Sequence, residues 1–105
     1  MEIEFDKKYL RELYETGVTT DKKHRFQPDI VKRYQARVRT LETVSKTEDL
    51  YTFRSLRYEK LKGDKAGIEA IRVNNQYRIE FKTKQVASEM VITICNILEL
   101  SNHYK

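Results

Sequence analysis

The fold is decided by the stretch Ile71-Arg72-Val73-Asn74-Asn75-Gln76-Tyr77-Arg78-Ile79-Glu80-Phe81, in which apolar and polar residues alternate on both sides of a turn. One face of each strand is apolar, and a one-residue slip would reverse one strand relative to the other. A two-residue turn at 74–75 would pair Ile71 with Arg78 and mix the faces. We therefore expect a three-residue turn over 74–76, which pairs Ile71 with Ile79 and Arg72 with Arg78.

This register places the guanidinium groups of Arg72 and Arg78 opposite each other, on the face away from the core. Like charges directly across a strand pair destabilise a sheet by up to about 1 kcal/mol. One interpretation is that an acidic neighbour offsets the repulsion, and Glu80 is the candidate on that face. The other interpretation is a phosphate site, for which the planar fork of donors is well suited. The residues alone leave both interpretations open.

The net positive charge of the chain is concentrated around this hairpin. Residues 54–84 contain nine Lys and Arg against four Asp and Glu, a surplus equal to the formal net charge of +5 for all 105 residues. A concentrated basic surface on a small protein favours a polyanionic partner.

The rest of the pattern predicts one α+β domain over residues 1–105, with two N-terminal helices packed on a small antiparallel sheet of three to five strands. We expect a short strand at 2–5, then a helix that is capped by Asp6 and ends at Gly17. A second helix should begin at Pro28. Its apolar residues at helical spacing are Ile30, Tyr34, Val38 and Leu41. Residues 91–98 are apolar on both faces, which predicts an interior strand.

Other classes of protein are disfavoured. No apolar run approaches the roughly 20 residues that span a bilayer, and the acidic N-terminus lacks the pattern of a signal peptide, so we expect a cytoplasmic protein. The single cysteine, Cys95, lies in an apolar run and is expected to be a reduced core residue. His24 and His103 are far apart and have no second cysteine nearby, so no metal or other cofactor is expected.

The hairpin segment resembles a known family. Leu61-Lys62-Gly63-Asp64, followed by Ile71-Arg72-Val73-Asn74 and Gln76-Tyr77-Arg78-Ile79, is similar to the HigB-type toxins of the RelE/ParE superfamily. In that family a segment close to His-Pro-Leu-Lys-Gly-Asp precedes the arginine hairpin, and the chain ends near Asp-Tyr-His. The helix–helix–sheet order extends the resemblance over nearly the whole chain.

The resemblance implies the toxin of a type II toxin–antitoxin system, acting as a ribosome-dependent, metal-independent mRNA endonuclease. A 2′-hydroxyl of the RNA would attack the adjacent phosphate, which requires a base, an acid and cations around phosphorus. Arg72, Arg78, Lys62 and His103 match positions of the family motif and are implied as catalytic residues. Glu59 and Tyr104 complete the six catalytic candidates, near positions where the family has other residues. Further RNA-binding candidates are Arg57, Lys60, Lys65 and Lys82. The implied partners are the ribosome, mRNA and a cognate antitoxin, expected to be a helix-turn-helix, HigA-like protein that mediates any contact with operator DNA.

Two departures from the family pattern leave alternatives open. Glu59 precedes Lys60-Leu61-Lys62-Gly63 near the place where the family often has histidine, and Ser101-Asn102-His103 replaces Asp-Tyr-His. Tyr104, or Tyr58 beside Glu59, could replace the missing tyrosine.

The alternatives to a nuclease are a ParE-like inhibitor of DNA gyrase and a non-catalytic nucleic-acid-binding domain. The basic residues of the second helix are interpreted as an ordinary solvated face, with ribosomal RNA as an alternative contact. They are Lys32, Arg33, Arg37 and Arg39.

Overall fold

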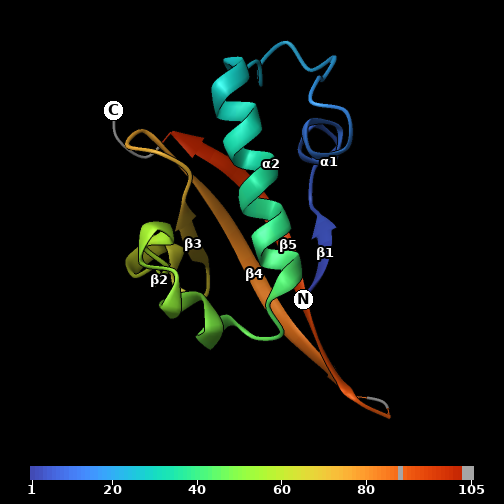
Figure 1. The fold of residues 1–105 in the computed structure, drawn as a ribbon, viewed down its shortest axis with the longest axis vertical. Helices are drawn as coiled ribbons and strands as arrows, with labels where there is room; N and C mark the ends of the chain where they lie inside the picture. The colour runs from blue at the N-terminus through green and yellow to red at the C-terminus, as the bar shows by residue number, and fades with distance from the viewer. Residues whose placement is uncertain (88, 103–105) are drawn as a thin grey trace.

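The computed structural model describes residues 1–87 and 89–102, which form an α+β fold (Figure 1). The elements in chain order are β1 (Glu2–Phe5), α1 (Lys8–Glu15), α2 (Pro28–Thr43), the 3₁₀ helices η1 (Thr47–Thr52) and η2 (Arg54–Leu56), β2 (Glu59–Lys60), the 3₁₀ helix η3 (Gly63–Lys65), β3 (Glu69–Arg72), β4 (Tyr77–Ala87) and β5 (Val91–Asn102). The predicted α+β fold class is confirmed, with both helices lying between β1 and the other four strands in the chain. In the described part of the chain, no helix is long and apolar enough to cross a membrane.

The five strands form one sheet in the order β1-β5-β4-β3-β2. Four strands pair antiparallel, as expected, but β1 joins β5 in parallel, so the sheet is mixed. The parallel pair is possible because the chain crosses over α1, α2 and three further strands before it returns to β5. β5 is an interior strand, as its apolar sequence predicted.

The hairpin has the predicted register. Ile71 is paired with Ile79 and Arg72 with Arg78. Val73 N donates to Tyr77 O at 2.9 Å, which leaves residues 74–76 as the turn. The Asn74 side chain stabilises this turn, because its Oδ1 accepts from the backbone N–H groups of residues 76 and 77 at 2.8 and 2.7 Å.

Both helices cover the same face of the sheet and form the core with it (Figure 1). The largest fully buried side chains of this layer include Tyr34 on α2 and Phe81 on β4. The Tyr34 hydroxyl donates to the carbonyl of Leu10 at 2.7 Å, which joins the two helices. The sheet face turned away from the helices, here called the outer face, carries the alternating polar residues of the hairpin.

The predicted first and last residues of the helices can be compared with those in the structure. α2 begins at Pro28 as predicted, and Gly17 follows α1 with φ +79°, the left-handed conformation expected after a helix. The prediction that Asp6 caps α1 is wrong. Lys7 precedes the helix without a side-chain cap, and Asp6 N donates to Ile97 O at 2.8 Å, so Asp6 continues the pairing of β1 with β5.

Candidate active site

The outer face of the sheet holds two rows of polar residues that run across the strands. Side chains of directly paired residues lie on the same face of a sheet. One row therefore contains Arg72, Arg78 and Ser101, on β3, β4 and β5. The adjacent row contains Glu59, Ala70, Glu80 and Glu99. The predicted pair of arginines thus lies beside a row with three carboxylates, interrupted by the small side chain of Ala70.

A hollow of about 340 Å³ opens over this part of the outer face, and we call it the hairpin pocket. It is lined by Arg57, Tyr58, Glu59, Ala70, Ile71, Arg72 and Arg78. Both arginines of the hairpin therefore line one pocket, together with two further site residues that the sequence predicted, Arg57 and Glu59.

Arg78 is held in place by a buried carboxylate. Glu80, which is 3% exposed, accepts from Arg78 Nε at 3.0 Å and lies 2.9 Å from Arg78 Nη2. The same carboxylate accepts from Lys65 Nζ at 2.8 Å, which fixes η3 over the outer face. Residues two apart on a strand share a face, so the sequence itself places Glu80 beside Arg78. The acidic neighbour that the fold-only interpretation required is present for Arg78.

Arg72 is placed differently from Arg78. Its Nε donates to Asn74 O at 3.1 Å, and its own carbonyl accepts from Arg37 Nε at 3.1 Å. Within the described residues Arg72 makes no ion pair with a carboxylate. The charge of Arg72 is therefore available to a bound anion.

Glu59 lies at the rim of the hairpin pocket. Its carboxylate is 57% exposed and lies 3.7 Å from Arg78 Nη1, longer than a hydrogen bond. The neighbouring Tyr58 is an unsuitable proton donor to the pocket, because its hydroxyl donates to Glu69 and is buried on the helix side. Burial, followed by that hydrogen bond, raises the pKa of Tyr58. Glu59 is the carboxylate of this pocket that solvent and a substrate can both reach.

The other predicted site residues are dispersed. Lys62 is exposed and immediately precedes η3, which the bond from Lys65 to Glu80 connects to the sheet. The register of β2 places Lys60 on the helix side of the sheet, in a separate hollow with Thr47 and Glu69. Lys82 lies on the outer face but farther along β4, in a hollow with Glu4 and Asn96. His103 and Tyr104 lie outside the described residues.

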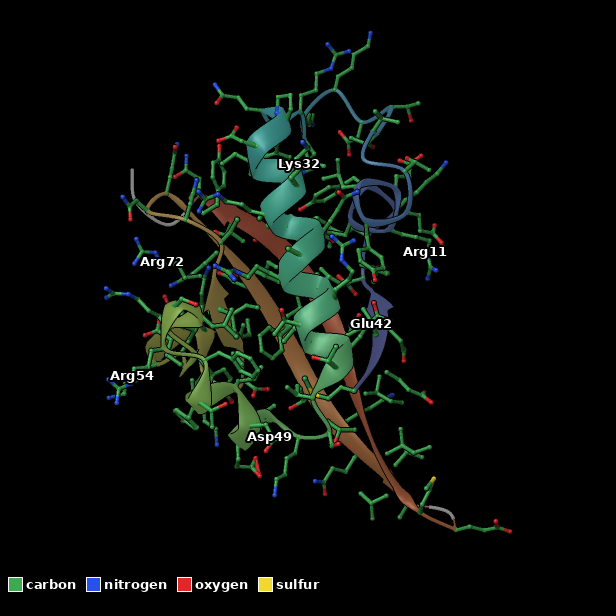
Figure 2. All side chains as sticks on the ribbon, viewed as in Figure 1. Arg11, Lys32, Glu42, Asp49, Arg54 and Arg72 are labelled. Atoms are coloured by element: carbon green, nitrogen blue, oxygen red, sulfur yellow. The ribbon has the colours of Figure 1, made fainter. Side chains whose placement is uncertain are left out.

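A second and larger hollow, of about 570 Å³, adjoins the hairpin pocket. We call it the arginine groove. Its cationic lining residues are Arg33, Arg37, Arg54, Arg57 and Arg72, and its one carboxylate is Asp29. Arg57 and Arg72 line both hollows, so the two are neighbours on the surface. Figure 2 shows Arg54 and Arg72 on the same side of α2, opposite to the side of Arg11.

Lys32, Arg33 and Arg39 on the second helix are exposed, as the interpretation as a solvated face expects, but Arg37 is half-buried and lines the groove together with Arg33. Arg33 and Arg37 are four residues apart, so they project from one side of α2, and this side borders β3 and η2. Burial, with the charges of Arg33 and Arg72, lowers the pKa of Arg37 from its ordinary value. The i, i+4 spacing was the signal in the sequence, but only the packing of α2 beside β3 shows which side of the helix matters.

Arg57 has the only left-handed backbone among the described non-glycine residues, with φ 46°. It ends η2 and turns the chain so that Tyr58 enters the core while Arg57 stays exposed between the two hollows. A left-handed conformation costs an L-residue roughly 1–2 kcal/mol. Such outliers concentrate at functional sites.

Neither a reactive thiol nor a metal site is supported in the described part of the chain. Cys95 is fully buried, and burial raises its pKa to about 12, so the thiol is protonated at neutral pH, as expected for a core residue. Among residues 1–87 and 89–102, no group of three or more His, Cys, Asp or Glu side chains could hold a metal ion. The chemistry of the two hollows is that of guanidinium groups and carboxylates.

Comparison with known proteins identifies the same family as the sequence of the arginine hairpin. The model of the HigB-like toxins, described as RelE-like toxins of type II toxin–antitoxin systems, matches residues 3–94. The chain belongs to this family. Toxin HigB-1 of Vibrio cholerae serotype O1 is 35% identical to this HigB-like toxin over 83 residues, which cover 78% of this chain and 83% of that protein.

The fold of this HigB-like toxin is also found among solved structures. A YoeB/ParE toxin from Agrobacterium tumefaciens aligns with 99% of this chain and 100% of its own, with a TM-score of 0.59 and 18% identity. At this identity the likeness concerns the fold alone. Membership of the family makes the protein a toxin of a type II toxin–antitoxin system and implies a cognate antitoxin.

Proposed function

We propose that this HigB-like toxin is a ribosome-dependent endonuclease that cleaves mRNA and so inhibits translation. The observation that carries the proposal is the hairpin pocket, in which two arginines face each other beside an accessible carboxylate. Attack by a 2′-hydroxyl on the adjacent phosphate would give a cyclic phosphate and a free 5′-hydroxyl. The negative charge that develops on the phosphate oxygens is the charge that these guanidinium groups are placed to stabilise.

The roles follow from the placement of each residue. Arg78 is oriented by Glu80 before substrate binds, so little reorganisation is needed in the transition state. Arg72 supplies the second fork of donors, and Lys62 adds a cation from η3. Glu59, at the rim, is the candidate base for the 2′-hydroxyl. His103 is the candidate acid for the leaving oxygen, because imidazole titrates near neutral pH, with Tyr104 as a further contact to the phosphate.

The ribosome is the proposed source of substrate geometry. The hairpin pocket is open, and a small open pocket does not by itself align a flexible RNA for in-line attack. A message held in the decoding site is already ordered, which lowers the entropic part of the barrier. This target would place the protein in the bacterial cytoplasm. We also propose a HigA-like, helix-turn-helix antitoxin as the partner that blocks this reaction.

Mapping of mRNA ends by primer extension in a cell-free translation reaction tests the proposal. The wild-type protein should give cuts that require translating ribosomes. Arg72→Ala and Arg78→Lys should abolish them, because the first removes a fork and the second keeps only a point charge. Lys84→Ala, at an exposed position farther along β4, is the control that should cut normally. His103→Ala tests the proposed acid.

Other results would replace the proposal. Intact messages and unimpaired translation would exclude the endonuclease. Gyrase inhibition in a supercoiling assay would then support the ParE-like alternative. Cleavage that persists undiminished in Arg72→Ala and Arg78→Lys would show that the reaction does not use the hairpin pocket.

A further inference from the structure

The arginine groove contains more positive charge than the hairpin pocket and is not needed for the proposed chemistry at the scissile phosphate. Three of its five arginines, Arg33, Arg37 and Arg54, do not line the hairpin pocket. They come from α2 and η2, which are separate in sequence from the hairpin. A fold gains nothing from gathering five like charges around a hollow, since like charges repel at short range.

Several features of the groove favour a ligand with a chain of phosphates. The groove and the hairpin pocket share Arg57 and Arg72, so an extended ligand that lies across these two residues would contact both hollows. Guanidinium groups bind phosphate oxygens through two parallel N–H groups. The amide-bearing residues Asn74 and Asn75, together with Ser55, line the same hollow and add neutral hydrogen-bonding groups.

Two of the five guanidinium groups of the groove, those of Arg37 and Arg72, are held by hydrogen bonds before any ligand binds. Arg37 Nε donates to the carbonyl of Arg72, which directs this side chain from α2 toward β3. Arg72 Nε donates to Asn74 O, so Arg72 is fixed against the turn. Arg57 lines both hollows from a backbone position with left-handed φ. Side chains that are already ordered lose less entropy when they bind.

We propose that the arginine groove binds the phosphodiester backbone of the single-stranded message on one side of the scissile phosphate. Arg57 and Arg72 would contact the phosphate at the junction, while Arg33, Arg37 and Arg54 would contact the phosphates that follow. This inference rests on the proposed function for the identity of the RNA, but the binding itself does not require cleavage. The groove would thus set the direction in which the message crosses the toxin.

Fluorescence anisotropy with the full-length toxin tests this binding directly. The probe is a labelled 2′-O-methyl RNA of about ten nucleotides, within the range that one single-strand-binding domain contacts. The 2′-O-methyl group blocks the attacking hydroxyl, so binding is measured even if the protein is an active nuclease. The test variant is Arg33→Gln/Arg54→Gln, whose changes are at exposed positions. The matched control is Arg39→Gln, an exposed arginine of α2 outside the groove.

The double variant should bind the probe about tenfold or more weakly at low salt, because it loses two charged contacts. The magnitude of the slope of log K against log salt concentration should fall by about 1.4, because each of the two lost contacts with a single-strand phosphate contributes about 0.7. Arg39→Gln should bind as the wild type does. Equal thermal melting temperatures for all three proteins would show that the fold is unchanged.

Three results would overturn the assignment, and each can be separated from failure of the proposed function. Unchanged affinity and salt slope in the double variant would show that RNA does not use the groove, even if wild-type toxin cuts messages on ribosomes. A double variant that binds the probe normally but binds vacant ribosomes poorly would place ribosomal RNA in the groove. If the toxin bound a labelled poly-glutamate peptide but not the RNA probe, the groove would be assigned to an acidic segment of a protein. Conversely, groove-dependent binding without cleavage would support the groove and refute the nuclease.

Discussion

Glu80 should be the most important charged residue for the stability of the hairpin, and Glu80→Gln tests this. The carboxylate is 3% exposed and contacts Arg78 Nε at 3.0 Å, Arg78 Nη2 at 2.9 Å and Lys65 Nζ at 2.8 Å. Glutamine keeps the shape and one acceptor oxygen but removes the negative charge. Arg78 and Lys65 then lie close together without the anion that joins them.

The expected loss can be worked out from these contacts. Removing one partner of a buried ion pair costs about 3–5 kcal/mol. The contribution of Lys65 is small because its side chain is 44% exposed and solvent screens it. Glutamine also retains one hydrogen bond to Arg78. We therefore expect Glu80→Gln to lower the free energy of unfolding by about 2 kcal/mol. For a domain of this size the melting temperature would fall by roughly 8–16 °C.

Urea denaturation followed by circular dichroism measures the change, and Glu99→Gln provides the control. Glu99 is paired with Glu80 across β4 and β5, and within the described residues it makes no ion pair. Its substitution should change the free energy of unfolding by less than about 0.5 kcal/mol. If Glu80→Gln had the same urea midpoint as the wild type, the ion pair would contribute nothing to stability and our account of Arg78 would be wrong. A double-mutant cycle with Arg78→Met should give a coupling energy of about 1–3 kcal/mol.

Three further predictions concern single residues. Tyr34→Phe should lower the free energy of unfolding by about 1 kcal/mol in urea denaturation, because the buried carbonyl of Leu10 loses its donor; an unchanged value would contradict the 2.7 Å bond. Arg57→Gly should raise the urea midpoint slightly, since the roughly 1–2 kcal/mol of left-handed strain exceeds the entropic cost of glycine, and should weaken RNA binding in the anisotropy assay. Cys95 should react with a thiol reagent only after unfolding, and because its pKa is raised from 9.0 to about 12 in the folded state, stability should fall as pH rises across that interval. Cys95→Ala should lose less stability over the same interval, and equal losses would refute this contribution of the thiol.

The hairpin could be predicted from sequence because its apolar residues alternate with a strict period of two. That period fixes which residues share a face, and the need to pair two apolar faces then fixes the register. The pairing of Arg72 with Arg78 and the position of Glu80 beside Arg78 both follow from local pattern. The family resemblance came from the same segment, because its motif residues are the ones that the register brings together.

What the sequence left undetermined depends on contacts between distant segments. Nothing in residues 2–5 indicates whether that strand pairs in parallel or antiparallel, since an edge strand can satisfy its backbone in either direction. Asp6 has the residue type of a helix cap, but pairing with Ile97 extends β1 through it. The basic residues of α2 occupy several sides of the helix, and only its packing beside β3 selects Arg33 and Arg37 for the groove.

The two interpretations of the paired arginines can be weighed separately for Arg78 and for Arg72. The fold-only interpretation is sufficient for Arg78, whose charge is offset by a buried carboxylate on its own strand. It is not sufficient for Arg72, which within the described residues has backbone partners but no ion pair, and which borders both hollows. A positive charge beside four other arginines raises the energy of the empty protein, and a bound phosphate lowers it again. Arg72 is therefore the arginine whose charge remains for the phosphate that we propose, whereas the charge of Arg78 is offset by Glu80 with or without a ligand.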